Sequence, residues 1–279
     1  MSQASSRATA NPYLLQTRQG LFRVCDQGDP EAPVLMLSNS LGTTLEMWSL
    51  QMEALLRDYR VIRYDTRGHG GSPVSPGPYT FDGLGEDVLA ILDELHVQRA
   101  SFCGVSMGGH TALWLGIHAP GRFDALVVCN SAAKIGTESS WKERADMVRT
   151  QGRAGMQALA DSAPGRWFTQ AFVASHPEAV ATMQAGIVSI DPQGYAGCCD
   201  ALGRSDLSGS LSRICVPTLI IAGEHDPATT VADARIMHEG ITGSELLILP
   251  VSHISNVEAP QAYNEAVLSF LRRARAAAH

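Results

Sequence analysis

The sequence has no apolar run long enough to cross a membrane, no run of lysine and arginine, and no cysteine pair at C-x-x-C spacing. A membrane-spanning helix needs about 20 mostly apolar residues. Binding to nucleic acid or to an anionic membrane needs a concentration of positive charge. This chain instead has 21 basic and 28 acidic residues, a formal net charge of −7. We therefore expect neither nucleic acid nor a membrane as its partner, and its oligomeric state stays open.

The six cysteines are scattered, and two of them, Cys103 and Cys129, fall inside apolar runs. This distribution indicates buried free thiols rather than a metal site or a disulfide framework. The first twelve residues, MSQASSRATANP, contain a single arginine and no apolar core, which is atypical of a signal or transit peptide. We expect a cytoplasmic protein. The other cysteines are Cys25, Cys198, Cys199 and Cys215.

The hydrophobic pattern predicts an α/β fold. The chain has 279 residues, of which 45% are hydrophobic and 18% charged, enough for a large core. Residues 12–26 alternate around Gln19-Gly20 like an antiparallel hairpin, and helical spacing follows at 81–95 and 263–271. Strands alternating with helices favour a mostly parallel sheet with helices on both faces. Short apolar runs typical of buried strands occupy 34–37, 60–64, 100–105, 125–129, 217–222 and 245–249.

One interval departs from this alternation. From about Ser131 to Ser212 the pattern is helical, interrupted by Gly152, Pro164-Gly165, Pro177 and Pro192. A stretch of that length between two strands must fold on its own. We assign residues 132–212 to a helical cap over the carboxyl ends of the strands, where ligands bind in open α/β folds. Residues 1–131 and 213–279 then form the core, and a purely structural extension is the alternative.

The strongest motif is Gly104-Val105-Ser106-Met107-Gly108, between an apolar run and a helical segment. A G-x-S-x-G turn in this context is the nucleophile elbow of serine hydrolases. Glycine brackets the serine because a side chain at either position would collide with nearby backbone. Ser106 would then stand at a helix N-terminus, whose N–H groups favour a developing negative charge. An ordinary strand-to-helix turn is the alternative.

Two later strand ends supply an acid and a base. The run PTLIIAG is followed by Glu224-His225-Asp226, and ELLILP by Val251-Ser252-His253. The order Ser106, Asp226, His253 is the one that this motif requires. His253 would exchange the proton of Ser106, and Asp226 would hold the imidazole in the right tautomer. Asp226 is preferred to Glu224, which lies closer to the strand and is expected to face the core edge.

The oxyanion hole needs two backbone N–H groups. Met107 follows the nucleophile and is predicted to supply one. The other is predicted from the loop Asn39-Ser40-Leu41-Gly42 after VLMLS, with Leu41 as the donor and Ser40 as the neighbouring alternative. Of the remaining polar residues, Asp65 and Arg67 are expected to fix a loop, and His69, His110, His118 and His225 to be structural or exposed.

The chain resembles the α/β-hydrolase superfamily and, within it, the 3-oxoadipate enol-lactonases of the β-ketoadipate pathway. The similarity runs nearly end to end, and the cap strings and the Ser-Asn-Ser-Leu-Gly loop are its most specific parts. His110, two residues after the last glycine of the elbow, is a departure from the pattern. The strings are SNSLGTTLEMW, RVIRYDTRGHGGSP, FCGVSMGG, SWKERADMVR, GRWFTQAF, GYAGCCDAL, IAGEHDPAT and SHISNVEAP.

The resemblance implies hydrolysis of 3-oxoadipate enol-lactone to 3-oxoadipate through an acyl-enzyme, without metal or organic cofactor. The substrate would be a small anionic lactone. A broad-specificity carboxylesterase or perhydrolase of the same fold would share the triad and differ in the cap. A non-catalytic ligand receptor is a third reading, which the complete triad disfavours.

An anionic lactone would need a local cation in this acidic chain. Between residues 134 and 166 the sequence has six basic residues against four acidic ones. Arg144 follows Trp141 by three residues, so both side chains project from one helix face. We expect Arg144 to hold the substrate carboxylate, Trp141 to cover the ring, and Trp167 to form a second wall.

Overall fold

The computed structural model describes residues 11–277, so most of the segment considered above as a leader, residues 1–10, lies outside the described residues. Eight strands form one sheet in the order β1-β2-β4-β3-β5-β6-β7-β8. The β1–β2 and β2–β4 pairs are antiparallel, and the other neighbours are parallel. The strands are Tyr13–Thr17 (β1), Gly20–Gln27 (β2), Val34–Ser38 (β3), Arg60–Tyr64 (β4), Ala100–Val105 (β5), Phe123–Cys129 (β6), Thr218–Gly223 (β7) and Glu245–Leu249 (β8).

The predicted α/β fold is therefore confirmed, strand by strand. The central strands β4, β5 and β7 are buried along their whole length, as continuous apolar runs in a parallel sheet should be. The strands β3, β5, β6, β7 and β8 are consecutive parallel neighbours, so their carboxyl ends lie at one edge of the sheet. This edge collects the loops that carry the candidate site.

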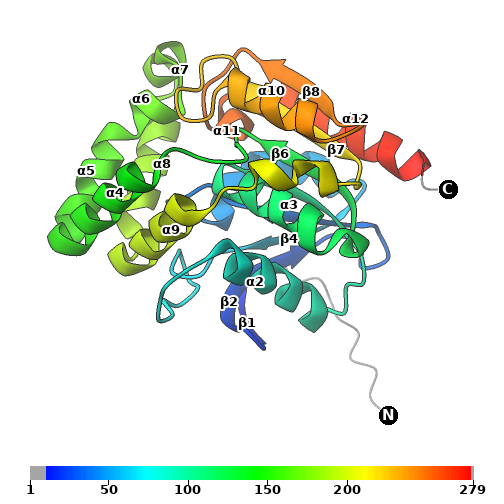
Figure 1. The fold of residues 1–279 in the computed structure, drawn as a ribbon, viewed down its shortest axis with the longest axis horizontal. Coiled ribbons are helices and arrows are strands. Elements are labelled where there is room, and N and C mark those ends of the chain that lie inside the picture. Colours follow the sequence, from blue (N-terminus) through cyan, green and yellow to red (C-terminus); the bar gives the residue numbers. More distant parts are fainter. Residues whose placement is uncertain (1–10, 278–279) are drawn as a thin grey trace.

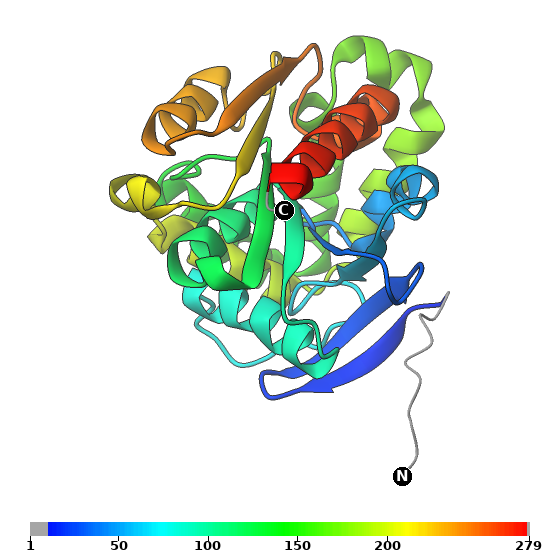
Figure 2. The ribbon, with the colours of Figure 1, turned by 90° about the vertical axis from the view of Figure 1, so that its right-hand side faces the viewer.

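Helices cover both faces of the sheet. In Figure 2, α2, α3 and α10 lie on one side of the strands, and α1 and α12 on the other. The helices around the sheet are Leu45–Gln51 (η1), Met52–Leu55 (α1), Phe81–Glu94 (α2), Met107–His118 (α3), Pro120–Arg122 (η2), Ser208–Arg213 (η3), Val231–Gly240 (α10), Ser255–Glu258 (α11) and Pro260–Ala277 (α12).

Six α-helices follow β6 in the interval before β7, and they gather on one side of the molecule (Figure 1). Pro164, Pro177 and Pro192 each begin a helix, where the missing N–H costs nothing. Gly152 separates two helices with a φ of 56°, which glycine adopts without strain. These helices, called the cap below, are Glu138–Gln151 (α4), Arg153–Ser162 (α5), Pro164–Trp167 (α6), Gln170–Ser175 (α7), Pro177–Ser189 (α8) and Pro192–Arg204 (α9).

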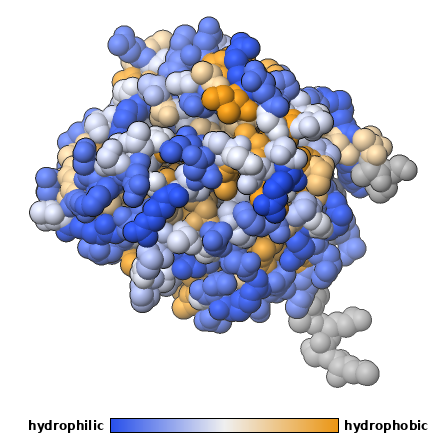
Figure 3. Space-filling view, viewed as in Figure 1, coloured by the Kyte–Doolittle hydropathy of each residue, from blue (hydrophilic) through white to orange (hydrophobic). Residues whose placement is uncertain are grey.

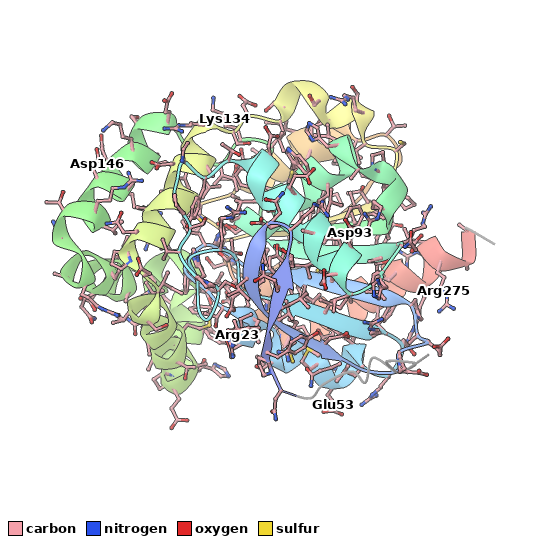
Figure 4. All side chains as sticks on the ribbon, turned by 90° about the horizontal axis from the view of Figure 1, so that it is seen from below. Arg23, Glu53, Asp93, Lys134, Asp146 and Arg275 are labelled. Carbon is pink, nitrogen blue, oxygen red and sulfur yellow. The ribbon has the colours of Figure 1, made fainter. Side chains whose placement is uncertain are left out.

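One face of the molecule shows the polarity of its surface. Figure 3 shows one face that is mostly hydrophilic, with hydrophobic residues in small separate groups. Figure 4 shows Asp146 at the outer side of the cap and Lys134 nearer the core. Among residues 11–277 the structure contains no helix that is both long and apolar enough to cross a membrane.

Candidate active site

Ser106 lies at the sharp turn between β5 and α3. Its backbone has a φ of 57° and a ψ of −114°, a conformation that residues other than glycine rarely adopt. A Cβ atom at Gly104 would lie 2.1 Å from the carbonyl oxygen of Gly108, and one at Gly108 would lie 2.3 Å from that of Ser38. Only glycine fits at these two positions, so the close packing of β3, β5 and α3 holds the serine in its strained conformation.

The side chain of Ser106 belongs to a hydrogen-bonded series of three groups. Its Oγ lies 2.9 Å from Nε2 of His253, and Nδ1 of the same imidazole lies 2.7 Å from Oδ2 of Asp226. Because a carboxylate only accepts, Nδ1 carries the proton and Nε2 is left to accept one from Ser106. This is the tautomer that a general base beside a serine needs.

Asp226 is held as a carboxylate. Burial opposes its ionisation, but the adjacent imidazole of His253 and the donors of Thr229 outweigh burial and lower the pKa of Asp226. The Thr229 hydroxyl donates to Oδ2 at 2.8 Å, and Asn130 donates to the same oxygen at 3.2 Å. The Thr229 amide donates to Oδ1 at 3.0 Å. These donors fix the carboxylate toward His253 and keep it charged.

Glu224 is not part of this series. The sequence placed it toward the core edge, whereas its side chain is exposed to solvent. The chain leaves the sheet after Gly223 and turns, with the Asp226 amide donating to the Gly223 carbonyl. This turn sends Glu224 outward and Asp226 inward, so the expectation for the direction of Glu224 was wrong.

The loop after β3 borders Ser106. The Gly108 amide donates to the Asn39 carbonyl at 3.1 Å, and the Gly42 amide donates to His69 Nε2 at 3.2 Å. Within the described part of the chain, the amides of Met107, Leu41 and Ser40 have no acceptor. The assignment of Leu41 and Met107 as oxyanion donors stays a prediction, with Ser40 as the alternative.

Asp65, which the sequence assigned to fixing the loop after β4, holds that loop through Gly71 and also anchors the loop after β3 through Leu45. Its carboxylate accepts from the Leu45 and Gly71 amides at 2.8 and 2.9 Å. Burial lowers the pKa of His69 to about 4, so the imidazole is neutral at pH 7 and can accept the bond from Gly42. Arg67 pairs with buried Asp87 and thereby fixes the following loop to α2.

A cavity of about 180 Å³ opens onto Ser106 and His253. Trp141, Arg144 and Trp167 all line it, so the structure brings together the three cap residues that the sequence singled out. The Arg144 guanidinium lies 4.8 Å from the centre of the Trp141 ring, in the range of a cation–π contact.

Two further cap residues that line this cavity, Arg166 and Tyr195, were not predicted from the sequence. Arg166 was counted among the basic residues of the cap without a place in the site, and Tyr195 was not considered. The signals were weak, since Arg166 merely precedes Trp167 and Tyr195 lies within the cap string GYAGCCDAL. The other apolar lining residues from the cap and its entry are Ile135, Leu159 and Ile187.

The loop that carries His253 is attached to the cap. The Ile254 amide donates to the Trp167 carbonyl at 3.1 Å. The Glu258 carboxylate accepts from the Ser252 amide at 2.8 Å and from the Thr169 amide at 3.0 Å. Because of these bonds, the position of His253 depends on the positions of α6 and α7.

His110, four residues after the nucleophile, joins α3 to both connections of the cap. Its Nδ1 lies 2.8 Å from the Ala132 carbonyl and must donate to it, and its Nε2 lies 2.7 Å from Ser205 Oγ. The side chain is fully buried, and burial lowers the pKa of His110 to about 4. It is a structural residue, as expected, and it packs against Phe81.

This histidine predicts a pH dependence of stability. In the unfolded chain a histidine binds its proton near pH 6.5, but folded His110 and His69 do so only near pH 4. The unfolded state therefore binds more protons in this window, and stability present above pH 6.5 is lost as the pH falls toward 4. The slope approaches about 1.4 kcal/mol per pH unit for each histidine.

Urea unfolding at several pH values between 8 and 4 measures that slope. We expect His110→Asn to be less stable than the wild type at pH 8 and to lose stability less steeply below pH 6.5. His118→Asn is the matched control, because His118 lies on the same helix and is exposed. Identical slopes for His110→Asn and the wild type would contradict the assignment.

The thiols of Cys103 and Cys129 are buried, as predicted from the apolar runs that contain them. Five of the six cysteines are buried, and Cys215 is exposed. No group of three histidine, cysteine, aspartate or glutamate side chains suited to a metal ion occurs in residues 11–277.

Comparisons with known proteins agree with this geometry. A profile of the alpha/beta hydrolase fold family matches residues 33–260. The 3-oxoadipate enol-lactonase 2 of Acinetobacter baylyi is 48% identical over 88% of this chain and 91% of its own length. The 3-oxoadipate enol-lactonase 1 of that organism is 42% identical over 93% and 96%. The crystal structure of the enol-lactonase from Burkholderia xenovorans superposes with a TM-score of 0.90 and 40% identity, covering 93% of this chain and all of that one.

The family match and the similarity along the chain agree with the geometry at the sheet edge. The protein is a hydrolase of the α/β-hydrolase family, and it is similar over nearly its whole length to 3-oxoadipate enol-lactonases.

Proposed function

We propose that this chain hydrolyses 3-oxoadipate enol-lactone to 3-oxoadipate, as in the β-ketoadipate pathway of aromatic compound degradation. The observation that carries the proposal is the hydrogen-bonded series Asp226–His253–Ser106 at the base of a cavity that arginine also lines. The choice of 3-oxoadipate enol-lactone as the substrate rests on the names of the relatives. The reaction class, hydrolysis of an ester or lactone, rests on the side chains of this series.

In this mechanism Ser106 Oγ attacks the ring carbonyl while His253 Nε2 takes its proton. The carbonyl oxygen becomes an oxyanion, which the amides of Met107 and Leu41 would stabilise. Collapse breaks the ring C–O bond and leaves an acyl-enzyme whose other end is an enolate. Proton transfer from His253 and tautomerisation give the ketone. Water, activated by His253, then releases the diacid and restores Ser106.

The cap residues fit a small anionic substrate. Arg144 would pair with the carboxylate, and Trp141 and Trp167 would cover the ring, since all three share the cavity with Ser106. A volume of about 180 Å³ is below the ~300 Å³ at which pockets for drug-sized ligands begin. A narrow cavity with a cation suits a compact lactone better than the substrates of a broad-specificity carboxylesterase.

Arg144→Met tests the carboxylate contact. On the enol-lactone we expect kcat/KM to fall by about 10- to 100-fold, the range for losing hydrogen bonds to a charged group. On the uncharged methyl ester of the lactone we expect little change. Steady-state hydrolysis of both freshly prepared compounds measures the difference.

Arg149→Met is the matched control, since Arg149 lies on the same helix and pairs with Asp200. Equal losses on both compounds, or no loss on either, would remove Arg144 from the substrate site. A wild-type enzyme that hydrolyses simple aryl esters and leaves the enol-lactone intact would refute the proposed substrate.

A further inference from the structure

A second arginine shares the cavity. Arg166, in the short helix α6, lines it together with Arg144 of α4, and both side chains are half-buried. The two cations come from different elements of the cap and reach the same space beside Ser106.

The acidic side chains of the cap do not neutralise this pair. Asp146 binds Lys142 and Arg149, and Asp200 binds Arg149. Within residues 11–277, neither Arg144 nor Arg166 has a carboxylate within ion-pair distance.

The two guanidinium groups also interact with each other. Burial and the charge of Arg144 both lower the pKa of Arg166. Both arginines act on Tyr195 as well, where they partly offset the effect of burial, which raises the pKa of its hydroxyl. Like charges in a partly buried space repel, and an anion bound between them removes that cost.

A structural role alone would leave part of Arg166 unused. Its Nη2 donates to the Leu159 carbonyl at 3.3 Å and to Ser162 Oγ at 3.2 Å, and its Nε donates to the Ser162 carbonyl at 3.4 Å. These bonds satisfy the C-terminal end of α5, a common use of arginine. The remaining group, Nη1, has no acceptor in the part of the chain that the structure describes. The helix end fixes the guanidinium and leaves donors for a ligand.

We propose that Arg166 and Arg144 together form one anion site that holds the carboxylate of the substrate, with the Tyr195 hydroxyl beside it. The inference rests on the proposed function, because it takes the acyl group to carry a carboxylate. Arg166 is then a specificity-determining residue. The pair selects acyl groups that end in a carboxylate over uncharged ones of the same length.

The test uses a pair of aryl esters that do not depend on the lactone. The monoester 4-nitrophenyl hydrogen adipate forms an acyl-enzyme with a terminal carboxylate, and its methyl ester forms the uncharged counterpart. The measured quantity is the ratio of kcat/KM for the acid to kcat/KM for the methyl ester. We expect Arg166→Met to lower this ratio by about 10-fold or more, mainly through KM for the acid.

A double-mutant cycle tests whether the two arginines act on one carboxylate. If they do, Arg144→Met and Arg166→Met are coupled, and the ratio for the double variant falls by a factor different from the product of the single effects. Arg149→Met, outside the cavity, is expected to keep the wild-type ratio. An uncharged fluorophosphonate counts the active enzyme in each preparation.

Arg166→Gln guards against a folding defect, because its amide can still donate at the end of α5 but has no charge. Equal losses on the acid and the methyl ester in Arg166→Met and Arg166→Gln, with a lowered melting temperature, would show that Arg166 only caps α5 and would overturn the inference. A wild type that prefers the adipate acid through Arg166 but leaves the enol-lactone intact would refute the proposed substrate and keep the anion site.

Discussion

Ser106→Ala is expected to reduce kcat by about six orders of magnitude, as loss of the nucleophile does in well-studied serine hydrolases. The Oγ atom that attacks the carbonyl is absent in this variant, and His253 has no proton to accept from it. The fold should persist, because the elbow depends on the glycines at 104 and 108 and on the backbone bond from the Ser106 amide to the Cys129 carbonyl at 2.8 Å.

Steady-state hydrolysis, fluorophosphonate labelling and circular dichroism together check this expectation. Ser40→Ala is the matched control, since Ser40 also lines the cavity but could contribute to the oxyanion hole only through an amide that alanine keeps. A folded Ser106→Ala enzyme with near wild-type turnover would exclude the elbow as the site of chemistry.

Asp226→Asn is expected to lower kcat by about four orders of magnitude. In the wild type, the Asp226 carboxylate accepts a hydrogen bond from His253 Nδ1 at 2.7 Å. An asparagine amide can donate there instead, which favours the tautomer with its proton on Nε2. That nitrogen then faces Ser106 as a donor, so the serine hydroxyl loses its base.

Glu224→Gln provides the comparison on the same loop, because Glu224 is exposed and two residues from Asp226. We expect it to retain wild-type kcat. Comparable losses in the two variants would leave the acid unassigned, and wild-type activity in Asp226→Asn would refute the proposed role. The Asp226 side chain has no exposed surface, so solvent does not screen its charge. A small loss of activity in Asp226→Asn could therefore not be explained by such screening.

Much of the fold could be read from the order of residues because the signals are local. Continuous apolar runs mark strands buried on both faces, and proline or glycine marks most boundaries between the cap helices. The elbow was equally readable, because Gly104 and Gly108 are required by contacts within a few residues and with the neighbouring strand β3. The limits of the cap, residues 132–212, stay a prediction.

The direction of side chains was less predictable. Glu224 and Asp226 are two residues apart, and only the turn after Gly223 decides that one enters solvent and the other faces His253. Leu41 and Ser40 likewise differ by one residue, and loop register depends on distant anchors such as Asp65.

By itself the sequence determined the fold class, the strands, the elbow and the chain order of Ser106, Asp226 and His253, since each follows from short-range pattern and from the connectivity of a parallel sheet. It also indicated that Arg144 and Trp141 share a helix face. Only the tertiary structure decided that this face meets Ser106, that Arg166 and Tyr195 complete the same wall, and that His110 ties both connections of the cap to α3. The physical reason is that helices pack through contacts between segments far apart in the chain. No local pattern reports the orientation that those contacts select.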